Sequence, residues 1–400
     1  MLKNGQSKSS FLFSIFVSTI TAFLFGINLT IIELLKKNFN DYVKNNSLKY
    51  ILGIDINIFW SVIVGILFLG GLVGSTIAYN LNIRNKQKIT TAYTLFLIGF
   101  TIKFIPKIPI AFLISRFILG VAIGISCEVV PVYISNVTPS KIKGVVGCIY
   151  QFNIVAGIIV CQALSYFFEE NLNGMYVISA MIILSLFLVI GSLFIIDFKI
   201  MESSDKGLMA LFKNKKSKLS IICAIIFHLG QQFSGISGVI SFSNTIFKNT
   251  SNERLYTLCL GITKLIAIGM AMFVIESVGR KILMVISIIL VTLGHILLMM
   301  HIHPFSGIFT FIIGFALGLG PVVWLICGDI FPQEYKSAGM FLSLIFNWVG
   351  GFTITTLFDI LYKKFGVYSF SLYSVVMVCM LFFVLIVFKE NKDKESKFLE

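Results

Sequence analysis

The sequence predicts an all-α membrane protein with about twelve transmembrane helices arranged in two six-helix halves. Three observations predict this fold class. Of the 400 residues, 57% are hydrophobic and only 12% are charged, whereas soluble domains carry about 25% charged residues. Apolar runs recur along the whole chain at the length of roughly 20 residues that a helix needs to cross the hydrocarbon. Finally, loop signatures of the first half return in the second half at nearly one offset.

Twelve apolar runs mark the expected helices. The first run follows two lysines, but it is longer than the apolar core of a signal peptide and has no small-residue cleavage site. We therefore expect it to be retained as a helix. The seven cysteines lie within apolar stretches without metal-ligand spacing, which predicts packing roles and neither disulfides nor a metal site. The runs lie at 11–35, 57–80, 89–106, 109–135, 145–168, 174–196, 219–247, 256–275, 282–302, 305–330, 337–362 and 367–388.

A lysine-rich polar stretch divides these runs six and six. It is the longest polar segment in the interior of the chain, and it predicts a cytoplasmic linker between two halves. The expected parts are an N-terminal half 1–196, the linker 197–218, a C-terminal half 219–388 and a cytoplasmic tail 389–400.

The formal net charge is +14, which in a soluble protein would suggest nucleic acid as a partner. Here the basic residues lie in loops and tails, so we interpret them as signals of topology. With a cytoplasmic N-terminus, the tails and inner loops carry 20 Lys and Arg residues, against 10 in the outer loops, where Lys103 is counted. Cytoplasmic loops carry the excess of positive charge. Both termini are therefore predicted to be cytoplasmic, in a bilayer that we expect to be the plasma membrane.

The two halves repeat each other. Three loop residues after the fourth run return with the same spacing 193 positions later, after the tenth run: Asn136, Pro139, Lys143 and Asp329, Pro332, Lys336. A second signature returns at an offset of 194: Asn82, Asn85, Lys86 and Glu276, Gly279, Arg280. Repetition at a fixed offset indicates a duplicated unit. Parallel six-helix repeats are the plan of the major facilitator fold, in which the binding site lies between the halves near the bilayer midplane.

The densest polar cluster within an apolar run includes Gln231, Gln232 and Ser237. Polar groups in the membrane cost free energy and mark functional sites. A glutamine amide both donates and accepts hydrogen bonds, which suits neighbouring hydroxyl groups of a sugar. The alternative is that these glutamines only bridge helices.

Further polar and aromatic residues extend this set. Gln151 and Asn347 add amides, and Trp324 offers a flat apolar face with an N–H donor. Gly318, Gly320 and Pro321 precede Trp324 and predict a weakened helix, which is either a gate or an ordinary kink.

Short motifs occur in a fixed order along nearly the whole chain. They are Phe25-Gly26-Ile27-Asn28, Arg116-Phe117-Ile118-Leu119-Gly120, Pro131-Val132-Tyr133 with Pro139 and Lys143-Gly144, Gln231-Gln232-Phe233-Ser234-Gly235-Ile236, Glu276-Ser277-Val278-Gly279-Arg280-Lys281, Gly320-Pro321-Val322-Val323-Trp324 and Asn347-Trp348. In these residues the sequence resembles the sugar porter family of the major facilitator superfamily and, within it, the facilitative glucose transporters.

The resemblance implies roles for individual residues. Those that match sugar-hydroxyl ligands are Gln151, Gln231, Gln232 and Asn347, and those that match the apolar pocket wall are Ile154, Ile236, Phe315 and Trp324. A cytoplasmic charge network that closes the inner gate is matched by Lys143, Glu276, Arg280, Asp329 and Lys336. Two ligand positions depart from the family, since Ser237 and Lys264 each replace an asparagine. Asn136 also stands where the family has a glutamate, which removes one carboxylate from the network.

Asn28 bears on energy coupling. Proton-coupled members of the family carry an aspartate at this position, and an asparagine amide does not take up a proton, so Arg116 lacks its carboxylate partner as in the facilitators. Glu128 lies inside the fourth run, where the family pattern predicts no acid. It either carries a proton or faces a cavity or a lysine.

Lys264 lies inside the eighth run. It either extends outward to the interface or faces the cavity, where it would bind a hydroxyl or an anionic substrate. The sequence therefore predicts a facilitative hexose uniporter that works by alternating access, with no covalent chemistry, cofactor or metal. The alternatives are a proton-coupled sugar symporter, a carrier of sugar phosphates or organic anions, and a sensor that binds sugar without transporting it.

Overall fold

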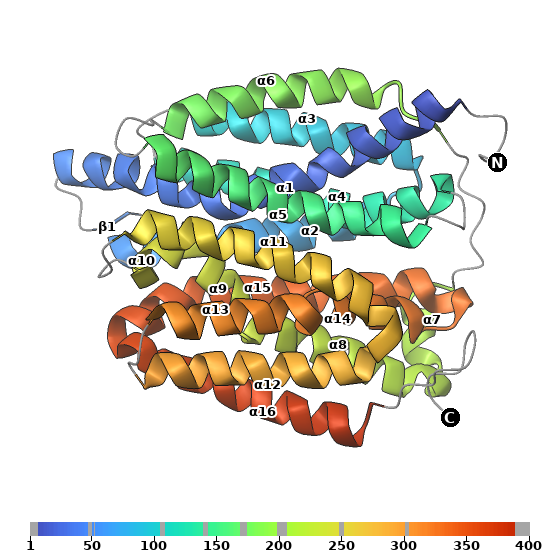
Figure 1. The fold of residues 1–400 in the computed structure, drawn as a ribbon. Helices are drawn as coiled ribbons and strands as arrows, with labels where there is room; N and C mark the ends of the chain where they lie inside the picture. The colour runs from blue at the N-terminus through green and yellow to red at the C-terminus, as the bar shows by residue number, and fades with distance from the viewer. Residues whose placement is uncertain are drawn as a thin grey trace. The chain divides into compact units, whose positions relative to one another are not determined.

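The computed structural model describes residues 7–46, 50–51, 53–104, 109–138, 143–168, 174–197, 206–247, 252–300 and 304–388. The chain divides into two compact units, Met1–Met201 and Glu202–Glu400. In each unit long helices run side by side (Figure 1). The boundary between the units falls inside the lysine-rich linker expected at 197–218.

Six long helices form the N-terminal unit: α1 (Lys8–Asn45), α2 (Ile56–Asn80), α3 (Asn85–Phe104), α4 (Pro109–Val137), α5 (Lys143–Phe168) and α6 (Gly174–Ser192). A two-residue hairpin of β1 (Tyr50–Ile51) and β2 (Ile54–Asp55) precedes α2. Side-chain caps begin two of the helices, since Ser7 accepts from the Ser10 amide and Asp55 from the Asn57 amide. Such caps satisfy amides that have no partner in the first helical turn.

Glycines bring α2 and α4 into close contact. A Cβ atom added to Gly74 would lie 2.1 Å from the Val121 carbonyl oxygen, and one added to Gly120 would lie 2.1 Å from that of Leu67. Gly26 and Gly157 do the same for α1 and α5. In lipid, where helices gain little from hydrophobic association, small residues allow the close backbone packing that holds them together.

The C-terminal unit contains shorter and more interrupted helices. They are α7 (Gly207–Lys213), η4 (Lys215–Ser217), α8 (Lys218–Phe233), α9 (Ile236–Ser241), α10 (Ser243–Phe247), α11 (Glu253–Val278), α12 (Arg280–Met299), α13 (Pro304–Gly314), η5 (Phe315–Leu319), α14 (Pro321–Asp329), η6 (Gln333–Tyr335), α15 (Lys336–Phe365), η7 (Gly366–Ser369) and α16 (Phe370–Ile386). Within this unit α12 packs against α13 and α16, and α8 packs against α15.

Two of the predicted helices are broken in the structure. The run 219–247 forms α8, α9 and α10. Gly235 separates α8 from α9 with a φ of 87°, a conformation that glycine reaches without steric cost. The run 305–330 forms α13 and α14, which are separated by the π-helical turn η5 and Gly320, and Pro321 begins α14. This second break occurs at the glycine and proline positions where the sequence predicted a weakened helix.

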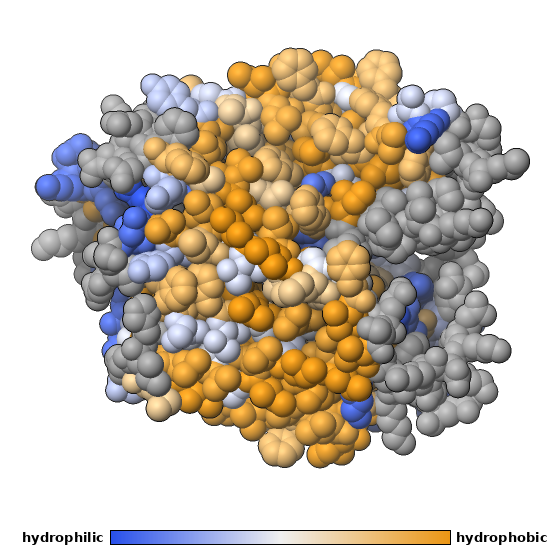
Figure 2. Space-filling view, in the orientation of Figure 1, coloured by the Kyte–Doolittle hydropathy of each residue, from blue (hydrophilic) through white to orange (hydrophobic). Residues whose placement is uncertain are grey.

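Ten helical stretches of the described chain are long and apolar enough to cross a membrane. One of them, Lys336–Ile386, contains both α15 and α16, and α3, which carries three lysines, is not among them. Counting α3 and separating α15 from α16 brings the described spans to the twelve expected. Apolar side chains cover the outward faces of the helices, and hydrophilic ones gather near helix ends (Figure 2).

Candidate functional site

Asn347 of α15 is the centre of a buried amide cluster in the C-terminal unit. Its Nδ2 donates to Gln231 Oε1 at 2.8 Å, and its Oδ1 accepts from Gln232 Nε2 at 3.2 Å. Its Nδ2 also lies 3.2 Å from Nδ1 of His228. Three of the predicted sugar ligands therefore meet in one hydrogen-bonded network, which joins α8 to α15.

Ser237 joins the network from the start of α9. Its hydroxyl donates to Gln232 Oε1 at 2.5 Å. The turn at Gly235 places it there, because a straight continuation of α8 would carry residue 237 to a different face. The neighbouring Ile236 is buried, as expected for a wall residue.

The broken helix around η5 is stabilised by side chains from other helices. Gln231 Nε2 donates to the carbonyl oxygens of Leu319 at 2.7 Å and Gly320 at 3.1 Å. The Ser287 hydroxyl donates to Gly314 O and accepts from the Leu319 amide. A break in a transmembrane helix frees backbone groups, which must find other partners inside the protein. Here Gln231 and Ser287 are those partners.

Aromatic side chains flank the cluster. The rings of Trp324 and His228 meet edge to face with centroids 4.6 Å apart. Trp324 is half-buried, whereas His228 is fully buried. Phe315 opens η5 and is buried, and the Lys264 ammonium lies 5.8 Å from the centroid of its ring. Trp324, Phe315 and Lys264 thus stand in the same unit as the amides and around the same broken helix.

The predicted ligands of the N-terminal unit lie on α5. Gln151 is half-buried, and Ile154 three residues later is buried. Gly26 of α1 packs directly on the Ile154 carbonyl, where an added Cβ would approach its oxygen to 1.9 Å. The α1–α5 contact therefore fixes the position of this face of α5.

Arg116 of α4 is buried and donates to three backbone carbonyls. Nη1 donates to Asn28 O at 2.5 Å, Nη2 to Val64 O at 3.0 Å and Nε to Ile63 O at 3.2 Å. The Asn28 side chain turns to its own helix, where Nδ2 donates to Leu24 O at 2.9 Å. In the described part of the chain, no carboxylate contacts this guanidinium.

Ion pairs join the predicted cytoplasmic ends of the C-terminal helices. Arg280 at the start of α12 pairs with Asp329 at the end of α14, as the predicted charge network requires. Lys206 is bound twice to Glu334, through its ammonium at 2.7 Å and its backbone amide at 2.9 Å. The hydrogen bond to Glu334 raises the pKa of Lys206 above its usual value. Lys336 is exposed at the start of α15, and the side chains of Lys143 and Glu276 lie outside the described residues.

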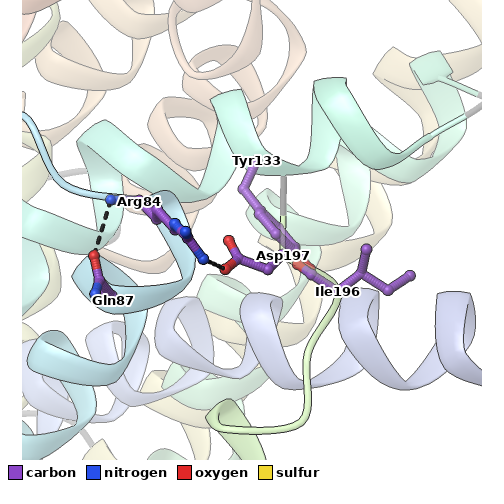
Figure 3. Close-up of polar contacts among 5 residues, drawn as sticks. All are labelled: Arg84, Gln87, Tyr133, Ile196 and Asp197. Atoms are coloured by element: carbon purple, nitrogen blue, oxygen red, sulfur yellow. Dashed lines mark hydrogen bonds and ion pairs between the residues drawn. The ribbon is translucent and has the colours of Figure 1, made fainter. Parts of the chain in front are cut away.

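A different ion pair closes the corresponding end of the N-terminal unit. Arg84 Nη1 lies 2.7 Å from Asp197 Oδ2, and the Arg84 amide donates to Gln87 (Figure 3). Tyr133 of α4 donates to the Ile196 carbonyl beside it. This pair links the start of α3 to the residues after α6. It supplies a carboxylate in the half where Asn136 replaces the family's glutamate.

Sequence reasoning missed several residues of these networks. His228 could have been assigned to the cluster from the sequence, because it stands three positions before Gln231 and four before Gln232 and so shares their helical face. No local sequence pattern indicates Asp197 or Ser287, since their partners are far away in the chain. Lys103, which was counted with the outer loops, lies in the last turn of α3, where it is buried and its Nζ has no hydrogen-bond partner among the described residues.

Glu128 is half-buried in α4. Its carboxylate is near enough to attract the ammonium of Lys88, which donates to the Ala78 carbonyl at 2.6 Å. A position facing a lysine was one of the possibilities that the sequence left open for Glu128.

Comparisons with known proteins identify relatives over nearly the whole chain. The family model described as "Sugar (and other) transporter" matches residues 11–197 and 198–398. Facilitated glucose transporter member 2 of solute carrier family 2 from Sus scrofa is 26% identical over 394 residues, covering 84% of this chain and 75% of the relative. Member 3 from Rattus norvegicus is 26% identical over 452 residues, covering 96% and 91%.

Solved structures with the same fold include a D-xylose-proton symporter, with a TM-score of 0.81, 19% identity, and coverage of 97% of this chain and 100% of that one. The xylose transporter XylE from E. coli in an inward open conformation has a TM-score of 0.79 at 20% identity, with coverage of 95% and 97%. At these identities the likeness establishes the fold.

Proposed function

Because the chain belongs to the sugar transporter family of the major facilitator superfamily, we propose that it carries a hexose across its membrane by downhill uniport with alternating access. Membership of this family shows that the chain is an integral membrane sugar transporter and not an enzyme. The hexose, the uniport mode and the residues that bind the sugar are the proposal. The relatives described as facilitated glucose transporters support it.

The amide cluster supports a sugar as the substrate. Gln231, Gln232 and Asn347 are buried in a membrane-spanning unit, where unpaired polar groups are costly, and they satisfy one another. A hexose hydroxyl both donates and accepts, so it can replace one of these bonds without leaving an amide unpaired. Trp324 would cover the apolar face of the ring.

The contacts of Asn28 and Arg116 carry the proposal of uniport. A proton-coupling site needs a group that gains and loses a proton during the cycle. Asn28 has an amide that does not titrate, and backbone carbonyls of Asn28, Ile63 and Val64 hold the Arg116 guanidinium. Transport would then follow the sugar gradient alone.

Counterflow in proteoliposomes tests the proposal. Vesicles loaded with unlabelled glucose are diluted into trace radiolabelled glucose, and the label should accumulate transiently above its equilibrium level. The variant Gln232→Leu should reduce this overshoot by about tenfold or more, since a buried hydrogen bond to a hydroxyl is lost. Exposed Lys213→Asn serves as the control and should behave as the native protein.

Two results would contradict the proposal. Binding of glucose without any flux would support a sensor, and absence of both binding and flux for a panel of hexoses would remove the hexose as substrate.

A proton-coupled symporter is the second candidate, and Glu128 is the observation that favours it. This carboxylate lies within α4 beside a lysine, so it is a titratable group in a membrane-spanning helix. The variant Glu128→Gln separates the candidates, because it removes the proton carrier and leaves the size of the side chain unchanged. Uniport predicts flux that does not respond to a proton gradient in either protein.

A further inference from the structure

Lys264 is a cation deep within the membrane-spanning part of the C-terminal unit. It stands 11 residues after Glu253, the first residue of α11, which is about 17 Å along the helix. The residue is only 5% exposed. This depth and burial oppose the reading in which the side chain extends to the outer interface.

Three carboxylates in the described part of this unit pair with other cations. Asp329 pairs with Arg280, Glu334 with Lys206 and Asp359 with Lys363. Glu253 begins α11, about 17 Å away along the helix, and Glu276 stands 12 residues further on, about 18 Å away. Within the described residues of the C-terminal unit, Lys264 therefore has no carboxylate, and its ammonium faces the Phe315 ring at 5.8 Å.

The same turn connects Lys264 to the amide cluster. Phe315 is the first residue of η5, and Leu319 is the last. The Gly320 amide donates to the Phe315 carbonyl, which closes the turn, and Gln231 donates to the Leu319 carbonyl. The ammonium thus contacts one end of a five-residue segment whose other end binds an amide of the cluster. The positive charge and the amide cluster therefore flank the same turn.

We propose that Lys264 binds an anionic substituent of the substrate, so that the carrier takes an acidic monosaccharide, a sugar bearing a carboxylate or a phosphate. A buried ammonium is costly in the membrane unless an opposite charge neutralises it. A substrate anion would supply that charge, and its hydrogen bond to the ammonium is of the strong, charge-assisted kind. The inference rests on the proposed function and narrows its substrate class.

The test compares neutral and acidic sugars on the full-length protein. Binding is measured as thermal stabilisation of the purified carrier by glucose, glucuronate and glucose 6-phosphate, which separates the carboxylate from the phosphate. Flux is measured in proteoliposomes by competition of the same compounds with a labelled sugar. The variants are Lys264→Asn, which removes the charge, and Lys264→Arg, which retains it. Lys213→Asn removes an exposed lysine of the same unit as a matched control.

The expected result is that one acidic sugar binds more tightly than glucose by about tenfold to a hundredfold, as one charge-assisted hydrogen bond provides. Lys264→Asn should abolish that preference, while Lys264→Arg should keep it. Lys213→Asn should change neither.

Each outcome separates the inference from the proposed function. Glucose flux with no preference for an acidic sugar, or a preference that survives in Lys264→Asn, overturns the inference and leaves the proposed carrier standing. Binding of an acidic sugar that depends on Lys264 but is never followed by flux supports the inference and overturns transport. Absence of binding and flux for all three sugars overturns both.

Discussion

At the scale of residues, Asn347 has three polar side-chain partners in the candidate site. It contacts Gln231, Gln232 and His228 at once, and all four side chains are buried. In an apolar unit such a network is stable only while every member has a partner. If the proposed function holds, a sugar that enters the cluster would have to replace amide contacts one for one, and the site would then favour hydroxyl groups.

Replacement of Asn347 by leucine tests this role. The change keeps the number and branching of the side-chain heavy atoms but leaves Gln231 Oε1 and Gln232 Nε2 without their partner, so we expect a stability loss of about 1–2 kcal/mol. Sugar affinity should fall by at least about tenfold. Both are measured on the purified protein, by thermal unfolding and by tryptophan fluorescence during sugar titration.

Thr353→Val on the same helix is the control, because the Thr353 hydroxyl donates to the Val349 carbonyl within α15. If Asn347→Leu bound sugar as tightly as this control, the amide cluster would not be the binding site.

At the scale of elements, the N-terminal helices pack closely at glycines, whereas two of the C-terminal helices are interrupted. Gly70 and Gly74 of α2 meet Gly120 and Gly124 of α4 in four close approaches to backbone atoms. In the other unit, η5 and the turn at Gly235 interrupt two helices, and the freed groups bind Ser287 and Gln231. The glycine contacts let helices pack closely, and the break at η5 frees backbone groups that buried side chains bind.

The substitution Gly74→Ala measures the glycine contact. Alanine in a helix is ordinarily more stable than glycine by about 0.5–1 kcal/mol. Here the added Cβ would approach the Val121 carbonyl oxygen to 2.1 Å, and overpacking costs about 1–3 kcal/mol. The steric cost of the added Cβ should exceed the gain in helix stability, so Gly74→Ala should lower the midpoint of thermal unfolding in detergent.

Gly191→Ala in α6 is the matched control, because its nearest neighbour atom would be 3.7 Å away. That variant should match or exceed the native midpoint. Equal midpoints for both variants would mean that α2 and α4 separate at no cost.

Much of the fold could be predicted from the sequence, and the reason is physical. Twelve apolar runs and a repeated loop signature fix helices and their grouping, because lipid tolerates few alternatives. Gly318, Gly320 and Pro321 predicted the weakened helix within 305–330, but the sequence did not predict that 219–247 would become three helices. The π-helical turn depends on Ser287, a partner from a different helix, which no local pattern reveals.

The candidate site was predictable in part. Gln231, Gln232, Ser237 and Asn347 do meet in one network, as their positions on a resembling pattern implied. The pairing of Arg84 with Asp197 spans 113 positions and follows only from folding. The sugar-binding roles of these residues stay predictions.

At the scale of the whole molecule, charge and polarity are distributed in a way that fits a carrier. Two units of similar size each bury polar side chains among apolar ones. In the N-terminal unit backbone carbonyls hold Arg116, and no carboxylate of the described residues contacts it. We therefore expect this protein to transport a sugar without transporting a proton.

Simultaneous recording of sugar flux and internal pH in proteoliposomes tests that claim most directly. A pH-sensitive dye is enclosed, and a neutral hexose that the carrier accepts is added outside in weakly buffered medium. For a uniporter we expect the sugar to enter while the internal pH stays unchanged, at a rate that a protonophore does not alter. Acidification of the lumen in proportion to the sugar that enters, abolished in Glu128→Gln, would contradict it.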